Sequence, residues 1–116
     1  MARTFSEVDY KRFRDRMELC ERKMGGGKLG YDTGCLRDLI STDSAGARSY
    51  FEFYLTAAQV GGSNYIKLAA IVAIGYLSVH RDDSLVRRLE PFIKDQAIRE
   101  EINSINVMWG QPPRTH

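Results

Sequence analysis

The sequence predicts an all-α protein, a compact array of about six helices arranged as antiparallel hairpins around a central buried helix at residues 64–80. Three observations support this class. Apolar residues recur at steps of three and four along most of the chain, and no four-residue stretch alternates cleanly as a strand would. Cap residues and glycines separate these periodic segments. The segment 64–80 is apolar on nearly every side, which is typical of a helix surrounded by other helices.

The length and composition indicate one globular domain spanning residues 1–116. The chain is 43% hydrophobic and 28% charged, with a formal net charge of +2, so its overall charge does not point to nucleic acid. Its first residues lack the apolar core of a secretory signal. The longest apolar run, 68–79, would cover about 18 Å as a helix, short of the ~30 Å core of a bilayer. We therefore expect no membrane span.

The first helix has a clear beginning. Ser6 and Asp9 form a pair like a capping box, and Phe5 and Tyr10 occupy the hydrophobic-staple positions around it. One apolar face follows at steps of three and four: Tyr10, Phe13, Met17, Cys20 and Met24. We expect this helix to continue until the glycines at 25–27 stop it.

A glycine-rich segment, 25–31, follows this helix and is predicted to be a flexible loop. It differs from a phosphate-binding loop because Lys28 lies inside the glycines, no Ser or Thr follows it, and a helix precedes it. A connector that becomes ordered on a partner fits the pattern better. Lys28 and Tyr31 are therefore candidate partner-binding residues.

Asp32-Thr33-Gly34 is the tripeptide that carries the catalytic carboxylate of aspartic proteases. Such an enzyme holds two of these tripeptides in turns between β-strands, where the two carboxylates share a proton. Here a triglycine loop and an amphipathic helix flank the tripeptide. We therefore predict that Asp32 is the N-cap of a short helix, with its carboxylate on the amide of Gly34 or Cys35.

Five further helices are predicted after Asp32, each beginning at a cap signal. Their expected extents are 33–40, 44–59, 64–80, 84–94 and a last helix that begins after Asp95. Pro91 should kink or restart the fifth helix because proline lacks the amide hydrogen that a helix interior needs. The C-terminal segment 109–116 is expected to be extended.

Cys20 and Cys35 are the two cysteines, and they do not form a metal-binding or redox motif. We expect both to be reduced thiols, in the cytoplasm or another reducing intracellular compartment. Two histidines are too few for a metal site without help from carboxylates. No catalytic, cofactor-binding or metal-binding residue is predicted.

The basic side of the first helix suggests one alternative function. Residues 1–28 carry eight basic and five acidic side chains, a small local excess that could follow a phosphate backbone. The candidate nucleic-acid-binding residues are Arg12, Arg16, Lys23 and Lys28. Surface solubility explains the same charges without any partner.

Trp109, the single tryptophan, stands beside the predicted helix end at Gly110. Tryptophan is common among interface anchors, so Trp109 is a third candidate partner-binding residue. Packing against its own core is the equally good alternative.

Residues 64–104 resemble the helical-hairpin repeats of the HEAT/armadillo class. The segments "YIKLAAIVAIGYLSV", "HRDDS", "LVRRLEPFIKD" and "QAIREEI" carry the resemblance, with Asp95 and Ile98-Arg99 at the opening of a next repeat. This resemblance implies a protein-binding scaffold of stacked hairpins.

Together these features favour a non-enzymatic interaction module, a small subunit or adaptor of a larger protein assembly. Its partners would be other protein subunits, including a second copy of itself. The alternative is a nucleic-acid-associated small subunit of a ribonucleoprotein-type complex.

Overall fold

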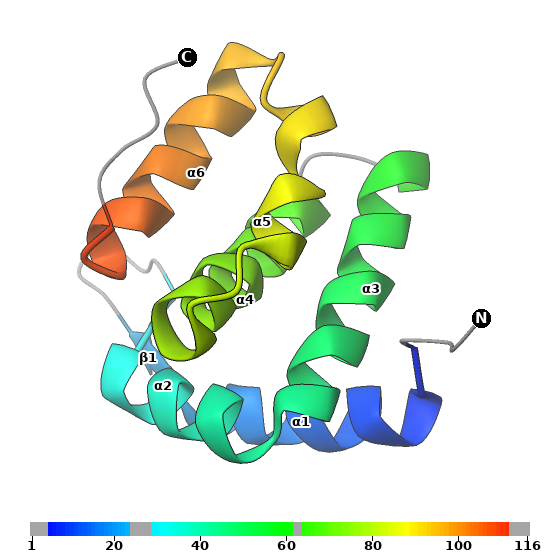
Figure 1. Cartoon of the computed structure of the whole chain (residues 1–116), viewed down its shortest axis with the longest axis vertical. Coiled ribbons are helices and arrows are strands. Elements are labelled where there is room, and N and C mark those ends of the chain that lie inside the picture. Colours follow the sequence, from blue (N-terminus) through cyan, green and yellow to red (C-terminus); the bar gives the residue numbers. More distant parts are fainter. Residues whose placement is uncertain (1–4, 24–28, 62–63, 112–116) are drawn as a thin grey trace.

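The structure, a computed structural model, describes residues 5–23, 29–61 and 64–111. It is all-α, with six α-helices in these ranges and one small two-stranded sheet (Figure 1). The elements are α1 (Glu7–Leu19), β1 (Glu21–Lys23), β2 (Leu29–Tyr31), α2 (Thr33–Thr42), α3 (Ser44–Gly61), α4 (Asn64–His80), α5 (Ser84–Arg87), the 3-10 helix η2 (Glu90–Phe92) and α6 (Gln96–Met108). The predicted fold class is confirmed.

Helix α4 lies at the centre of the molecule and contacts α2, α3, α5 and α6 (Figure 1). Its buried residues run almost without interruption along the middle of the helix: Ile66, Ala69, Ala70, Ile71, Val72, Ala73, Ile74, Gly75 and Tyr76. A helix that is apolar all round gains stability only when other elements cover each side. The central position predicted for residues 64–80 is therefore confirmed.

Helices α1 and α2 lie across one end of the α3–α4 pair (Figure 1). The expected cap of α1 is present, since the Ser6 hydroxyl accepts a hydrogen bond from the Asp9 amide at 3.3 Å. The Phe5 and Tyr10 rings, at the staple positions, lie 6.4 Å apart between centroids. The buried face of α1 contains Tyr10, Phe13 and Met17, as the spacing predicted.

The end of α1 differs from the prediction. The helix ends at Leu19, and the next residues form β1, which pairs in antiparallel register with β2. The register places Glu21 opposite Tyr31 and Arg22 opposite Gly30. The expectation of no strand was wrong, and part of the predicted loop 25–31 belongs to β2.

In the C-terminal third, the helices begin and end close to the positions that the sequence predicted. Pro91 lies in η2, and the segment expected as one helix over 84–94 divides into α5 and η2. Asp95 caps α6 by accepting a hydrogen bond from the Ala97 amide at 2.9 Å. At the other end of α6, Gly110 has a φ of 73°, a left-handed conformation that glycine adopts without strain.

Trp109 packs into the core and is only 3% exposed. Its indole N–H donates a hydrogen bond to the carbonyl oxygen of Ile71 at 3.1 Å. A Cβ atom added at Gly75 would lie 2.6 Å from the indole Cζ2, so the missing side chain at Gly75 makes room for the ring. Of the two alternatives for Trp109, the structure places it internally, and the extended tail predicted from residue 109 does not begin there.

Candidate interaction surfaces

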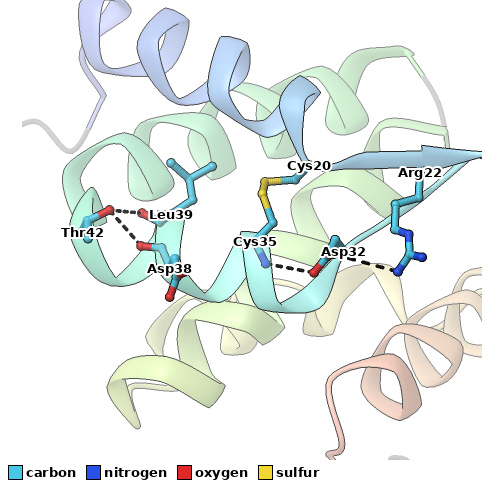
Figure 2. Close-up of a disulfide and its surroundings, with 7 residues drawn as sticks. All are labelled: Cys20, Arg22, Asp32, Cys35, Asp38, Leu39 and Thr42. Atoms are coloured by element: carbon cyan, nitrogen blue, oxygen red, sulfur yellow. Dashed lines mark hydrogen bonds and ion pairs between the residues drawn. A yellow bond between two sulfur atoms is a disulfide. The ribbon is translucent and has the colours of Figure 1, made fainter.

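Asp32 is the N-cap of α2 (Figure 2). One carboxylate oxygen accepts a hydrogen bond from the Cys35 amide at 3.0 Å, while the other lies 3.9 Å from the Arg22 guanidinium. A side-chain oxygen on an early helix amide satisfies a donor that the helix itself leaves open. The predicted capping role is confirmed, and the carboxylate is engaged by a helix amide.

Cys20 and Cys35 form a disulfide that joins the end of α1 to the first turn of α2 (Figure 2). Their Cα atoms lie 5.6 Å apart, within the range that a disulfide spans. The expectation of two reduced thiols was therefore wrong. The reason is that β1 and β2 fold back on each other and return the chain to Cys20, which sequence spacing alone did not reveal. The bond also does not fit the expected reducing compartment.

Of the two basic candidates on α1, Arg12 is engaged by acidic neighbours. The Arg12 guanidinium donates two hydrogen bonds to Asp43, at 2.7 and 2.9 Å, and lies 2.8 Å from the Asp9 carboxylate. The hydrogen bonds from Arg12 hold the pKa of the Asp43 carboxyl below its usual value. Arg16 is exposed. Arg12 thus already has two carboxylate partners that a phosphate would have to displace.

The other candidates from the loop region are only partly described. Lys28 and the side chain of Lys23 lie outside the described residues. Tyr31 is half-buried on β2, and burial together with Glu21 and Glu18 raises its pKa to about 12. Its hydroxyl therefore remains protonated at neutral pH.

Two possible features are not found in the part of the chain that the structure describes. There, no three His, Cys, Asp or Glu side chains gather closely enough to hold a metal ion. Across the same ranges, no helix has both the length and the apolar character that crossing a bilayer requires.

The outer face of α3 carries an apolar surface that sequence reasoning missed. Phe53, Ala57 and Val60 lie at positions i, i+4 and i+7, so they share one face of the helix. Phe53 is 40% exposed and Val60 is 87% exposed. With Phe5 and Thr56 they line a shallow groove of about 380 Å³, which we call the α3 groove. The sequence did hold a signal, because a second apolar stripe runs beside the core stripe of this helix.

Charge is scarce along this half of α3. From Phe53 to Gly61 the helix contains no charged residue. The charged residue that does line the groove, Glu52, accepts hydrogen bonds from both terminal nitrogens (Nη1 and Nη2) of the Arg88 guanidinium. The α3 groove is therefore an uncharged surface with a neutralised edge.

A row of aromatic rings borders the α3 groove and continues beyond it. Successive rings lie within 6.4 Å of each other between centroids: Phe5, Tyr10, Phe53, Tyr54 and Tyr65. Tyr10 and Phe53 form the closest pair, stacked at 4.3 Å. Aromatic pairs add stability beyond their buried area. Of these rings, Phe5 and Phe53 line the groove itself, and Tyr10 contacts both of them.

No family model, no curated protein and no solved structure matches this chain. The resemblance of residues 64–104 to HEAT/armadillo hairpins stays a prediction. In the structure this span consists of α4, α5, η2 and most of α6.

Proposed function

We propose that this chain is a non-enzymatic helical interaction module, a small subunit or adaptor that binds an amphipathic helix of a partner protein in the α3 groove. The observation that carries the proposal is the apolar stripe of exposed Phe53, half-buried Ala57 and exposed Val60, which lies on a surface without free charge. The predicted hairpin resemblance points in the same direction, because such repeats bind proteins.

The spacing of the stripe favours a helix as the occupant. Side chains at i, i+4 and i+7 form the ridge that one helix presents to another. A helix bound in a groove makes its contacts through side chains at this spacing. Between Phe53 and Val60 the groove is lined by two small residues, Thr56 and Ala57. Their size allows a second backbone to approach closely. An extended strand would need an open sheet edge instead.

The chemistry of the surface indicates an apolar contact face on the partner. The centres of protein interfaces are depleted in charged residues and enriched in aromatic ones, as the groove and its aromatic row are. Because Glu52 is already paired with Arg88, a charged partner residue would find no free counter-charge there. The partner helix should therefore present leucine, isoleucine or aromatic side chains.

Nucleic-acid binding has weaker support than protein binding. Arg12 would have to give up Asp9 and Asp43 to reach a phosphate. A salt titration separates the two functions, because displacement of counterions by basic side chains makes nucleic-acid affinity fall steeply with ionic strength.

The Cys20–Cys35 bond bears on where the module acts. Disulfides persist in oxidising compartments and are rare in reducing ones. We therefore leave the reducing compartment out of the proposal and place the module where a disulfide is stable.

The test of the α3 groove uses a displayed library of amphipathic helical peptides selected against the wild-type chain. Selected helices should lose at least about tenfold in affinity, about 1.4 kcal/mol, for Val60→Asp, because the new charge lies in the apolar contact. Val107→Asp is the matched control, since Val107 is 66% exposed on α6. Both variants should fold normally because both positions face solvent.

Three outcomes would decide against this function. Selected helices that bind Val60→Asp as well as the wild type would place binding elsewhere, and a library that gives no binder at all would remove helix binding. A wild-type dimer, detected by light scattering and dissociated by Val60→Asp, would assign the groove to a second copy of the chain.

A further inference from the structure

The β1–β2 hairpin is attached to the helices by few groups. Among the described elements, β1 and β2 pack mainly on each other, and each strand has three residues. Glu21 and Arg22 on β1 are exposed, so neither side chain anchors the hairpin in the core. A two-stranded hairpin on its own is only marginally stable in water. The hairpin therefore depends on the bonds that hold its ends.

The Cys20–Cys35 disulfide is the covalent bond at the ends of the hairpin (Figure 2). It joins the residue before β1 to the first turn of α2, which follows β2. Two weaker contacts lie beside it. The Asp32 amide donates a hydrogen bond to the Cys20 carbonyl at 2.9 Å, and the Arg22 guanidinium lies 3.9 Å from the Asp32 carboxylate. Exposed ion pairs contribute little to stability, so the disulfide is the strongest of these bonds.

Tyr31 is the side chain through which the hairpin meets the core. It lies on β2, is half-buried and packs against the buried cluster. It lines a cavity of about 110 Å³ together with Met17 of α1, Tyr50 and Tyr54 of α3, and Leu68 of α4. Burial raises the pKa of Tyr50 and Tyr54, and the nearby Tyr31 hydroxyl raises it further in both. Tyr31 therefore borders these four side chains on the side of the hairpin.

The four side chains beside Tyr31, which we call the covered surface, are apolar or aromatic. Met17 is 1% exposed and Tyr50 is 3% exposed, whereas Tyr54 and Leu68 are half-buried. When Tyr31 leaves, these side chains lose a neighbour and gain contact with water. They belong to α1, α3 and α4, and α3 packs directly against the other two helices. The covered surface can therefore be exposed while these helices stay in place.

Cleavage of the disulfide needs a thiol as the reductant. A thiolate attacks one sulfur and forms a mixed disulfide, which a second thiol then resolves. The two thiols lose two electrons and two protons and become a disulfide, while Cys20 and Cys35 gain them and become free thiols. Cys35 is half-buried whereas Cys20 is 3% exposed, so a thiol reaches the bond from the side of Cys35. Accessible disulfides of this kind are the labile and regulatory ones.

We propose that the Cys20–Cys35 disulfide is a redox latch, which a small thiol such as glutathione opens so that Tyr31 leaves the core and the covered surface becomes exposed. Reoxidation returns Tyr31 to its place. The helices α1, α3 and α4 keep their packing in both forms, because their contacts with each other do not pass through the hairpin. The latch does not depend on the α3 groove, since no residue of the covered surface lines that groove.

The first experiment compares the tyrosines that N-acetylimidazole modifies in the linked chain and in the chain reduced with glutathione and then freed of it without air. Peptide mapping by mass spectrometry locates the acetyl groups. Tyr31 and Tyr50 should react several-fold faster after reduction, because local opening exposes their hydroxyls. Tyr65, 43% exposed, should react in both forms. No increase at Tyr31 and Tyr50 in a chain whose mass shows both thiols would overturn the proposal.

Tyr76 separates the latch from a general loss of structure. It lies on α4, is 6% exposed, and its hydroxyl accepts a hydrogen bond from Arg48. Tyr76 should stay protected after reduction, and the helical signal in circular dichroism should not change. If Tyr76 reacts as fast as Tyr31 and the helical signal falls, reduction unfolds the whole chain and the disulfide has no switching role.

The variant Cys20→Ala/Cys35→Ala separates the effect of the bond from that of the reductant. Tyr31 and Tyr50 should react in this variant as in the reduced wild type, with or without glutathione. A variant that protects Tyr31 as well as the linked wild type does would show that the disulfide does not hold the hairpin. The reduced wild type keeps both native cysteines, so it tests the latch even where the variant unfolds.

A last measurement asks whether the latch is reversible. The chain is equilibrated in mixtures of reduced and oxidised glutathione, and the linked fraction is measured by mass after the thiols are blocked. The linked fraction should rise continuously with the oxidised share and should be the same from either starting form. A chain that stays fully linked in an excess of reduced glutathione carries a permanent disulfide, and this result would also overturn the proposal.

Discussion

Helix α4 and the corner formed by the β1–β2 hairpin with the first turn of α2 are stabilised in different ways. α4 is covered by four other helices, and its stability comes from apolar area removed from water. The corner contains two strands of three residues, and single contacts hold it: the Cys20–Cys35 disulfide and the Asp32 cap. A packed helix shares its stability among many neighbours, whereas the corner depends on a few specific bonds.

The largest expected effect comes from removing the indole that packs on α4. Trp109→Ala should lower the free energy of unfolding by about 3–5 kcal/mol, because it leaves a cavity in the core and removes the donor to the Ile71 carbonyl. Chemical denaturation followed by circular dichroism measures this loss.

Val107→Ala, two residues earlier on α6, is the control for Trp109→Ala. Val107 is exposed, so its truncation should change stability by less than about 0.5 kcal/mol. A Trp109→Ala chain as stable as the wild type would show that the indole contributes nothing to the core, contrary to its burial.

A smaller loss is expected when the corner loses its covalent link. Reduction of the disulfide, whose cysteines are 15 residues apart, should cost about 3 kcal/mol by the loop-entropy relation. Hydrogen exchange should rise first at the paired strands and only later in α4, because the link holds the strands and not the central helix.

The double variant Cys20→Ala/Cys35→Ala is the control for reduction, since a reductant should leave its stability unchanged. Non-reducing peptide mapping of the wild type should recover the two cysteine peptides as one linked species. Recovery of two separate thiol peptides would contradict the disulfide.

The smallest effect in this series concerns the cap of α2. Asp32→Ala should cost about 1 kcal/mol, because the Cys35 amide loses its acceptor. Asp32→Asn should retain most of the stability, since asparagine is an equally good N-cap. The same denaturation measurement checks both. Equal losses in the two variants would mean that capping is not the role of Asp32.

The sequence predicted α4 almost to the residue because its signal is repeated at many positions. Every turn of the helix carries apolar side chains, and cap residues mark the beginnings of α1, α2 and α6. Pro91 marked the division between α5 and η2 because proline has no amide hydrogen to donate inside a helix. Agreement of this kind rests on local chemistry that each segment carries by itself.

The corner was not predictable in the same way. Glu21 and Tyr31 face each other across a glycine-rich stretch, and strands of three residues are too short to show alternation. The pairing of Cys20 with Cys35 depends on that hairpin, so it was missed together with the strands.

The α3 groove did not follow from the sequence. The apolar pattern of α3 does not say which of its two stripes meets the core and which is left uncovered.

The position of Trp109 also makes the chain convenient to observe. Its fluorophore is the single tryptophan in the sequence and is buried against α4. Emission excited selectively at this indole should shift to longer wavelength when α6 separates from the centre, and it should remain steady when only the disulfide-linked corner opens. One spectrum can thus distinguish global unfolding from local opening without any added dye.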